Sequence, residues 1–308
     1  MRVWLRRTLM IVAVLLVLAG AAYYWLIVES HMPGNTAYTL DIARIREAAS
    51  AVHGDKPAAI EVEEVCLFTF PATGVVAGDG WSKVRLPVYS YRLLYPDHSS
   101  IIVDTAMTAA MGSGGQPTSF DAAALGRVQT AMSNAAQIVI THEHMDHIGG
   151  LTAHPSLPDV LPKTRLTQEQ LAHPERSVPA KFPDHVLDGY QPLVYDQYHA
   201  LAPGVVLVKA PGHTPGSQIV YVQTANGAEL LFIGDVAWHF RNIELQRERA
   251  RLMTMLFLKE DRTQVFGELA ALKRLHDTEP AVHIVPGHDG PVIDTLVAAG
   301  ILKRQFSP

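Results

Sequence analysis

Apolar residues recur with two different periods along the chain, and the periods predict strands and helices in separate segments. Apolar runs bounded by turn residues predict strands over 60–70, 84–95, 100–104, 137–140, 205–209, 219–222, 230–233 and 283–285. Helical spacing predicts helices over 41–51, 121–136, 167–172, 243–258 and 268–276. We expect the charged residues of the helix over 243–258 to form a solvated face. Strands and helices in this order predict a layered α/β fold.

The N-terminal segment follows neither period. Residues 8–28 form an uncharged, mostly apolar run, and a bilayer is crossed by roughly 20 such residues. Three arginines precede the run and Glu29 follows it, so the positive-inside rule places the N-terminus in the cytoplasm. We therefore predict a membrane anchor over residues 1–28, with the rest of the chain exported to the periplasm or the cell exterior. The alternative is a signal peptide cleaved at the small residues 19–21, which would release a secreted protein.

Length, charge and cysteine content narrow the possible classes. We divide the rest of the 308-residue chain into a linker with one short helix over 29–59 and a main domain over 60–308. The net charge of −5 argues against a nucleic-acid partner bound through a basic surface. Cys66 is the only cysteine, which excludes an intramolecular disulfide and a metal held by a cluster of cysteines. We expect its thiol to be buried in the core.

Three histidines and an aspartate, the candidate ligands, follow closely after the strand predicted over 137–140. Residues 141–150 are THEHMDHIGG. His142 and His144 are two residues apart, so in extended backbone their side chains point to the same side. Asp146 and His147 come where the chain can turn into a helix, so they project in another direction and could hold a second ion. Imidazole and carboxylate ligands suit a borderline divalent ion such as zinc.

Three more strand ends carry residues of the same type. His213, Asp235 and His288 each stand in a loop shortly after an apolar run. In layered α/β folds, sites assemble at the carboxyl ends of strands. Together with the ligands in residues 142–147, these positions provide three histidines for one ion, two histidines and an aspartate for another, and Asp235 as a bridge. We also expect Asp104, at the end of the strand over 100–104, to orient a metal ligand.

Two divalent ions at such a site indicate hydrolytic chemistry. Ions roughly 3.5–4 Å apart can hold a hydroxide between them and stabilise charge on a substrate oxygen. Zinc lowers the pKa of bound water to about 7, so the nucleophile exists at neutral pH. We expect two divalent metal ions, with zinc favoured and manganese or iron as alternatives.

At these positions the sequence resembles the metallo-β-lactamase fold hydrolases. Residues 141–147 match the signature cluster of that family, and 212–216, 234–235 and 287–288 match its remaining ligand motifs. Residues 102–105 resemble the strand end that precedes the cluster. The resemblance covers the chain from about residue 60 to the end, and it implies an αββα sandwich with the site at one edge. It also implies one ion held by His142, His144 and His213, a second held by Asp146, His147 and His288, and Asp235 shared.

Within that family the sequence is most similar to the lactonase branch, which includes N-acyl-homoserine lactone hydrolases. The interval between His213 and Asp235 and the segment before the first strand are typical of that branch. Those lactonases usually have a tyrosine three residues after the bridging aspartate, where this chain has Trp238. The indole N–H can donate a hydrogen bond but is not an acid near neutral pH. His239, Tyr190, Tyr195 and Tyr198 are candidates to replace the tyrosine.

The resemblance implies a hydrolase that opens a lactone or cleaves a related ester of a small molecule. Asp146 and Asp235 would be the catalytic carboxylates, with Asp146 passing a proton to the leaving group. Alternatives on the same fold are a phosphotriester or phosphodiester hydrolase, and then a thioesterase or a β-lactamase. A metal-binding or redox protein is the non-hydrolytic alternative, but His144 stands where the redox branch has a carboxylate. We expect the proline-rich segment 151–200 to shape the substrate pocket.

Overall fold

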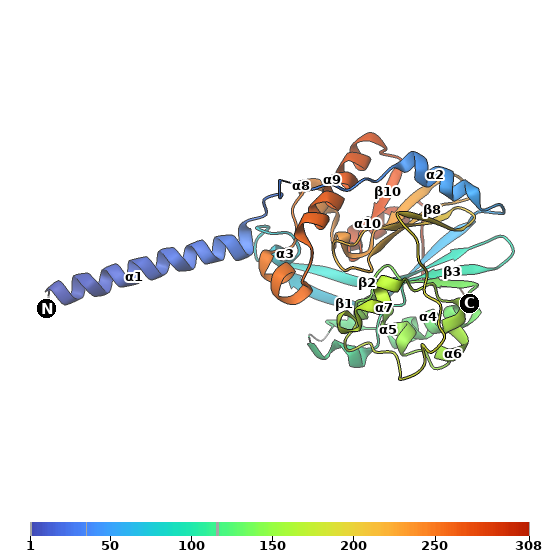
Figure 1. The fold of residues 1–308 in the computed structure, drawn as a ribbon, viewed down its shortest axis with the longest axis horizontal. Helices are drawn as coiled ribbons and strands as arrows, with labels where there is room; N and C mark the ends of the chain where they lie inside the picture. The colour runs from blue at the N-terminus through green and yellow to red at the C-terminus, as the bar shows by residue number, and fades with distance from the viewer. Residues whose placement is uncertain (1, 35, 115–116, 308) are drawn as a thin grey trace.

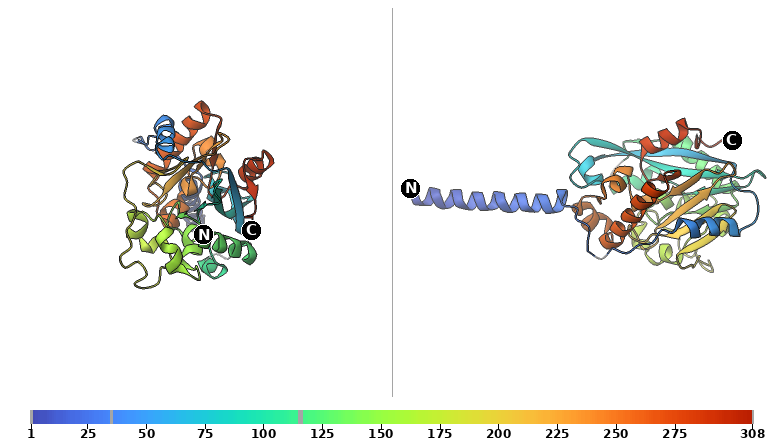
Figure 2. Two further views of the ribbon diagram at one scale, coloured as in Figure 1. Left: turned by 90° about the vertical axis from the view of Figure 1, so that its right-hand side faces the viewer. Right: turned by 90° about the horizontal axis from the view of Figure 1, so that it is seen from above.

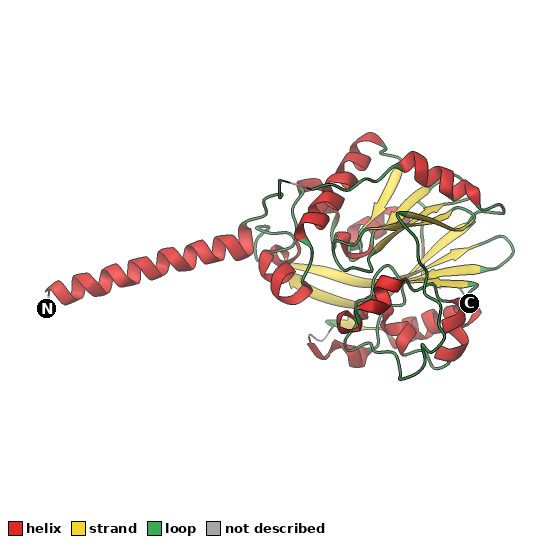
Figure 3. Cartoon of the chain, in the orientation of Figure 1, coloured by secondary structure: helices red, strands yellow, loops and turns green. Residues whose placement is uncertain are grey.

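Two β-sheets lie face to face at the centre of the protein, and helices cover their outer faces (Figures 1 and 3). The structure is a computed structural model that describes residues 2–34, 36–114 and 117–307. The first sheet has the order β11-β1-β2-β3-β5, with β4 paired to β1: β1 (Ala59–Pro71), β2 (Lys83–Leu94), β3 (Ser100–Val103), β4 (Ser119–Phe120), β5 (Gln137–Val139) and β11 (Lys303–Arg304). The second has the order β10-β9-β8-β7-β6: β6 (Tyr198–Ala202), β7 (Val205–Lys209), β8 (Gln218–Gln223), β9 (Glu229–Phe232) and β10 (Val282–Val285).

Successive side chains along each strand point to opposite faces of its sheet, and this alternation creates three layers of apolar packing. Ile101 and Val103 of β3 join the cluster between the sheets, whereas Ile102 packs on the outer face of the first sheet. Leu207 of β7 joins the same central cluster, and its neighbour Val206 packs on the outer face of the second sheet. Both faces of each sheet are therefore buried, which explains why the strands are nearly continuous apolar runs.

Three of the outer helices begin at capping aspartates. Against the first sheet pack α4 (Ala122–Asn134), α5 (Met145–Thr152) and α6 (Leu157–Val160), and against the second pack α2 (Ile42–Ala51) and α9 (Arg262–Thr278). The side chains of Asp41, Asp121 and Asp261 accept hydrogen bonds from backbone N–H groups of the first turns of α2, α4 and α9. The predicted layered α/β fold is confirmed. Shorter helices and helical turns include α3 (Ala72–Val75), η2 (Ala109–Gly114), η3 (Leu161–Lys163), α7 (Gln168–Ala172), η4 (Pro174–Arg176) and α10 (Gly290–Ala298).

The prediction of one continuous helix over 243–258 is wrong. Helix α8 (Phe240–Leu245) ends at Gln246, whose backbone is left-handed with φ 50°, and a separate π-helical segment, η6, spans Met253–Leu258. The charged residues between them were predicted to be solvated, but Glu248 and Arg249 are buried. Arg249 donates a hydrogen bond to the backbone oxygen of Asp235. Hydrogen bonds from a charged group contribute about 1.5–3 kcal/mol each, which outweighs the tenths of a kcal/mol per residue that helix propensity provides.

One helix extends away from the domain. Helix α1 (Arg2–Tyr23) continues into the π-helical turn η1 (Tyr24–Val28) and projects into solvent along its length (Figures 1 and 2). Of the described residues, this is the one helix that is long and apolar enough to cross a membrane, and a signal sequence has the same length and composition. The predicted linker then runs along the domain before α2, although its residue 35 lies outside the described part of the chain.

Candidate metal centre

All seven candidate ligands lie at one edge of the two sheets, in loops or first helical turns that follow strands. His142 and His144 stand in the loop after β5, and Asp146 and His147 lie in the first turn of α5. The remaining three follow strands of the second sheet: His213 comes after β7, Asp235 lies in η5 (Gly234–Val236) after β9, and His288 lies between β10 and α10. The fold therefore brings together every ligand position predicted from the sequence.

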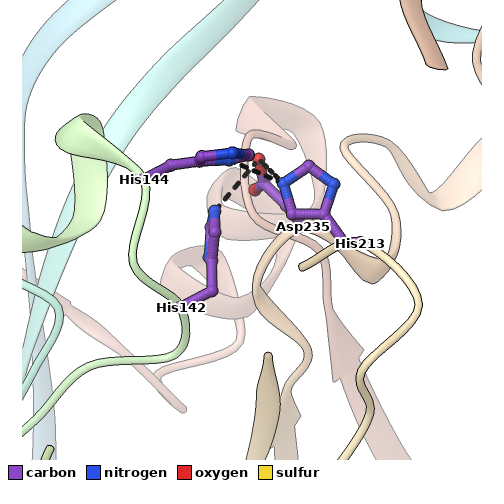
Figure 4. A group of neighbouring side chains, drawn as sticks. All are labelled: His142, His144, His213 and Asp235. Carbon is purple, nitrogen blue, oxygen red and sulfur yellow. Dashed lines mark hydrogen bonds and ion pairs between the residues drawn. The ribbon is translucent and has the colours of Figure 1, made fainter. Parts of the chain in front are cut away.

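The first group consists of His142, His144, His213 and Asp235. One ligand atom from each of the four lies within 4.8 Å of the others, and their side chains point toward one another (Figure 4). Nε2 of His213 is 2.9 Å from Nδ1 of His144 and 3.4 Å from Oδ2 of Asp235. Nε2 of His142 is 3.7 Å from the same oxygen.

The second group consists of Asp146, His147 and His288, and Asp235 reaches it as well. Oδ2 of Asp146 is 3.8 Å from Nε2 of His147 and 3.5 Å from Nε2 of His288. Oδ1 of Asp235 lies 3.4 Å and 3.1 Å from the same two nitrogens. The two oxygens of Asp235 thus face different groups, one each.

Buried polar atoms at the centre of these groups fit a bound cation. Within the described residues, Nε2 of His142, Nε2 of His147 and Oδ1 of Asp235 are buried and have no hydrogen-bond partner. A buried polar atom without a partner costs about 1–3 kcal/mol, so three in one place indicate a ligand that satisfies them. Imidazole nitrogens with carboxylate oxygens are donors that divalent metal ions such as zinc accept.

The ring nitrogens that face away from the centre are held by hydrogen-bond partners. Nδ1 of His147 lies 2.8 Å from Oδ2 of Asp104, so Asp104 contacts one of the candidate ligands. Asp104 also accepts hydrogen bonds from the backbone N–H and the hydroxyl of Thr141. Nδ1 of His288 lies 2.9 Å from the backbone oxygen of Pro87. Such partners fix the ring orientation and leave Nε2 free to bind.

Burial controls the protonation of two histidines of the first group. Burial, reinforced by the neighbouring imidazoles, lowers the pKa of His142 and His144 well below the ordinary value of 6.5. Both rings are therefore neutral at physiological pH, which is the form that binds metal. Burial opposes ionisation of Asp235, but His288, His147 and His142 together lower the pKa of its carboxyl well below 3.8.

An ion pair that the sequence did not predict lies next to His213. The side chain of Glu260 is fully buried, and its Oε1 lies 2.5 Å from Nδ1 of His213. The guanidinium of Arg249 donates to the same oxygen. Although burial opposes ionisation, Arg249 and His213 lower the pKa of Glu260. No local motif reveals the contact between Glu260 and His213, because the two residues are 47 positions apart along the chain.

Trp238 contacts two of the candidate ligands, Asp235 and His288. Its indole N–H donates a 2.6 Å hydrogen bond to Oδ2 of Asp235. Its ring packs edge-on against Phe70 and His288, with centroid distances of 6.1 and 5.9 Å, and the guanidinium of Arg249 lies over it. The indole donor is therefore directed at the carboxylate that both groups share.

The four residues suggested as replacements for the lactonase tyrosine do not line the pocket that contains Asp146 and Asp235. The hydroxyl of Tyr190 donates to the backbone oxygen of Thr164, and that of Tyr195 donates to the side chain of Gln218. The remaining two are engaged outside the pocket: the Tyr198 hydroxyl accepts from the backbone N–H of Asp41, and the His239 ring faces Asp289. The suggestion that one of them replaces the tyrosine is wrong.

A pocket of about 400 Å³ opens onto the ligands. Asp146, Asp235 and Trp238 line it, and so do Glu175, Arg176 and Val178. The last three belong to the proline-rich segment, so this segment lines the pocket that contains the candidate ligands. Phe257, Leu258 and Lys259, at the end of η6, line the pocket as well.

Comparisons with known proteins agree with this arrangement. Residues 85–288 match the sequence model of the metallo-beta-lactamase superfamily. The N-acyl homoserine lactonase AiiA of Bacillus thuringiensis subsp. kurstaki is 28% identical over 177 residues, which cover 52% of this chain and 68% of that protein. An N-acyl homoserine lactonase of Bacillus cereus is 25% identical over the same length and coverage.

Solved structures share the fold. An N-acyl homoserine lactone hydrolase with N-hexanoyl-L-homoserine bound at its catalytic metal centre aligns with a TM-score of 0.61 and 20% identity, over 78% of this chain and 96% of that one. AidC, a dizinc quorum-quenching lactonase, aligns with a TM-score of 0.51 and 15% identity, over 79% of this chain and 92% of that one. The chain belongs to the metallo-β-lactamase superfamily, and within it the chain is similar to the lactonase branch.

Proposed function

We propose that the protein is a metal-dependent hydrolase that opens lactones or cleaves related esters, with one divalent ion at each ligand group. The observation that carries the proposal is Asp235, whose two oxygens face different groups amid buried ligand atoms that lack protein partners. Lactones are favoured as substrates because the curated relatives at 25–28% identity are N-acyl homoserine lactonases.

The side chains divide the work between binding and proton transfer. Bound ions would supply Lewis acidity and a hydrolytic nucleophile at neutral pH, and we favour zinc for both. His142, His144 and His213 would hold the first ion, and Asp146, His147 and His288 the second, with Asp235 shared. The side chain of Asp146 is 19% exposed and that of Asp235 only 3%. Asp146 is therefore the carboxylate that can reach a substrate in the pocket and pass a proton to its leaving alkoxide.

Trp238 would act through Asp235 rather than on the substrate. Its donor is already used by the carboxylate, so the indole does not assist the substrate carbonyl as the lactonase tyrosine does. A donor fixed on Oδ2 orients the carboxylate between the two groups, which is how partners of metal ligands tune a site.

Replacing Trp238 with phenylalanine tests this role. Trp238→Phe keeps a ring between Phe70 and His288 but removes the hydrogen bond to Asp235. We expect kcat/KM for a lactone to fall by about 10–100-fold, with a weaker affinity for zinc in a competition titration. Trp81→Phe, at an exposed tryptophan, is the control and should change neither value. Wild-type activity and zinc affinity in Trp238→Phe would contradict the role.

We also propose that residues 1–28 remain on the protein as a membrane anchor through residues 8–28, that 29–59 connect it, and that 60–308 form the exported hydrolase. The length and composition of α1 and η1 support the anchor. So does the apolar character of Trp25, Leu26, Ile27 and Val28, which lie beyond the alternative cleavage site at 19–21, where a cleaved signal peptide would normally turn polar.

Intact-mass measurement distinguishes the anchor from a signal peptide. We expect protein purified from membranes to retain residue 1 or 2 at its N-terminus and to need detergent for extraction. A mature form that begins near residue 22 and appears in the soluble fraction would show cleavage, and the protein would then be secreted.

A substrate panel tests the reaction itself. Zinc-loaded protein should hydrolyse butanoyl- and dodecanoyl-homoserine lactone and aryl esters faster than a phosphotriester, a phosphodiester, a glutathione thioester or a chromogenic β-lactam. Turnover of the phosphorus substrates without any turnover of lactones would overturn the proposal.

A further inference from the structure

The end of the domain from which α1 emerges carries exposed apolar side chains on η6. Met255, Leu256 and Phe257 are 47%, 62% and 68% exposed. The short orange helix that contains them lies beside the end of α1 in two perpendicular views (Figures 1 and 2). Contacts agree with the views, because Arg251, two residues before η6, pairs with Glu29 and lies over the ring of Trp25.

The proposed anchor places a membrane boundary at this same end of the domain. At about 1.5 Å per residue, residues 8–28 span about 31 Å, which matches a hydrocarbon thickness of about 30 Å. The far boundary therefore lies near η1. Just before η1, the hydroxyl of Tyr23, the last residue of α1, accepts a hydrogen bond from the indole N–H of Trp81. Trp81 is 62% exposed, and tryptophan and tyrosine are the residues that concentrate at membrane interfaces.

Basic residues border the apolar surface. Lys259 directly follows η6, and Lys83 precedes Val84, which packs with Leu258 in one apolar cluster. Both lysines are exposed. An apolar surface with lysines at its margin is suited to the headgroup region of a bilayer.

The apolar surface is continuous with the pocket. Phe257 lies on η6 and also lines the pocket, and Val178, 51% exposed, lines it from another segment. A long acyl chain could therefore pass from lipid to the pocket along apolar side chains.

We propose that η6 inserts into the lipid interface beside α1, so that the pocket receives amphiphilic lactones or esters with long acyl chains from the bilayer. This proposal rests on the proposed hydrolase function and anchor. It commits to a lipid surface as the occupant of η6, and a second copy of the chain is the outcome that would replace it.

Spin labelling of the full chain in phosphatidylcholine–phosphatidylglycerol vesicles measures insertion. The native thiol of Cys66 is buried, so a nitroxide reacts with a cysteine introduced by Leu256→Cys. Val194→Cys is the matched control, because Val194 is 66% exposed in the loop before β6. We expect the label at 256 to collide more with oxygen than with a water-soluble nickel chelate, and the label at 194 to do the reverse. Aqueous behaviour at both positions, or dipolar broadening between two labels at 256, would overturn the proposal.

The dependence of kcat/KM on the length of the substrate's acyl chain tests whether the substrate reaches the pocket from the bilayer. In the same vesicles, the double variant Met255→Ser/Leu256→Ser should lower kcat/KM for dodecanoyl-homoserine lactone by roughly tenfold, because it removes apolar area from the interface. Turnover of the water-soluble butanoyl lactone should not change, and Val194→Ser should affect neither substrate. An equal loss with both lactones, or no loss with either, would overturn the proposal. If the unmodified chain opened no lactone, the hydrolase function would fail, and the spin-label depth would still decide whether η6 inserts.

Discussion

Asp235→Asn is expected to lower kcat/KM for a lactone by about 10³-fold, since the loss of several kcal/mol of electrostatic stabilisation corresponds to that factor. The oxygens of Asp235 face both ligand groups, and asparagine keeps only one oxygen and no charge. Both ions should therefore bind more weakly. The measurements are metal content by mass spectrometry after dialysis and the initial rate with a lactone.

Two controls separate this effect from unfolding. Asparagine has nearly the shape of aspartate, so the circular dichroism spectrum and the cooperative thermal transition should persist. Asp277→Asn, at a half-exposed residue of α9 that pairs with Lys273, should retain both metal and activity. Retention of two ions and full activity in Asp235→Asn would show that the carboxylate is not shared.

Glu260→Ala is expected to lower the free energy of unfolding by about 3–5 kcal/mol, the typical cost of leaving one partner of a buried ion pair alone. The side chains of Arg249 and Glu260 are 1% and 0% exposed, so water cannot replace the lost carboxylate. The substitution also removes the partner of His213. Urea unfolding in the presence of a chelator measures the contribution of the ion pair to stability separately from metal binding. In a zinc titration without the chelator, Glu260→Ala should show an affinity for zinc about 10–100-fold weaker than the unmodified chain.

A double substitution shows whether the cost comes from the isolated charge. Arg249→Met/Glu260→Leu removes both charges and should recover much of the lost stability, because apolar residues of similar size can replace a buried pair. Glu279→Ala, in the half-exposed pair with Arg46, should cost less than about 1 kcal/mol. If Glu260→Ala cost no more than Glu279→Ala, the ion pair would not stabilise the centre.

The ligand positions could be predicted because each is a local feature of the sequence. His142, His213 and His288 each follow an apolar run that forms a buried strand, and strand ends of one sheet edge lie close together. Asp104 was predictable for the same reason. The N-terminal helix was predictable from length and composition alone.

Features that depend on distant residues could not be predicted. Helical spacing favoured one helix over 243–258, but a left-handed Gln246 and the buried Arg249 divide it. The role of Glu260 depends on Arg249 and His213, and that of Trp238 depends on a rotamer that aims its N–H at Asp235. Tertiary hydrogen bonds, which sequence periodicity does not report, decide each of these cases.

Anomalous diffraction at the zinc edge tests the two-ion centre most directly. For crystals grown with zinc, we predict two peaks in the anomalous difference map. One should lie among His142, His144 and His213, the other among Asp146, His147 and His288, with one oxygen of Asp235 toward each. A single peak, or peaks away from these side chains, would contradict a dinuclear centre.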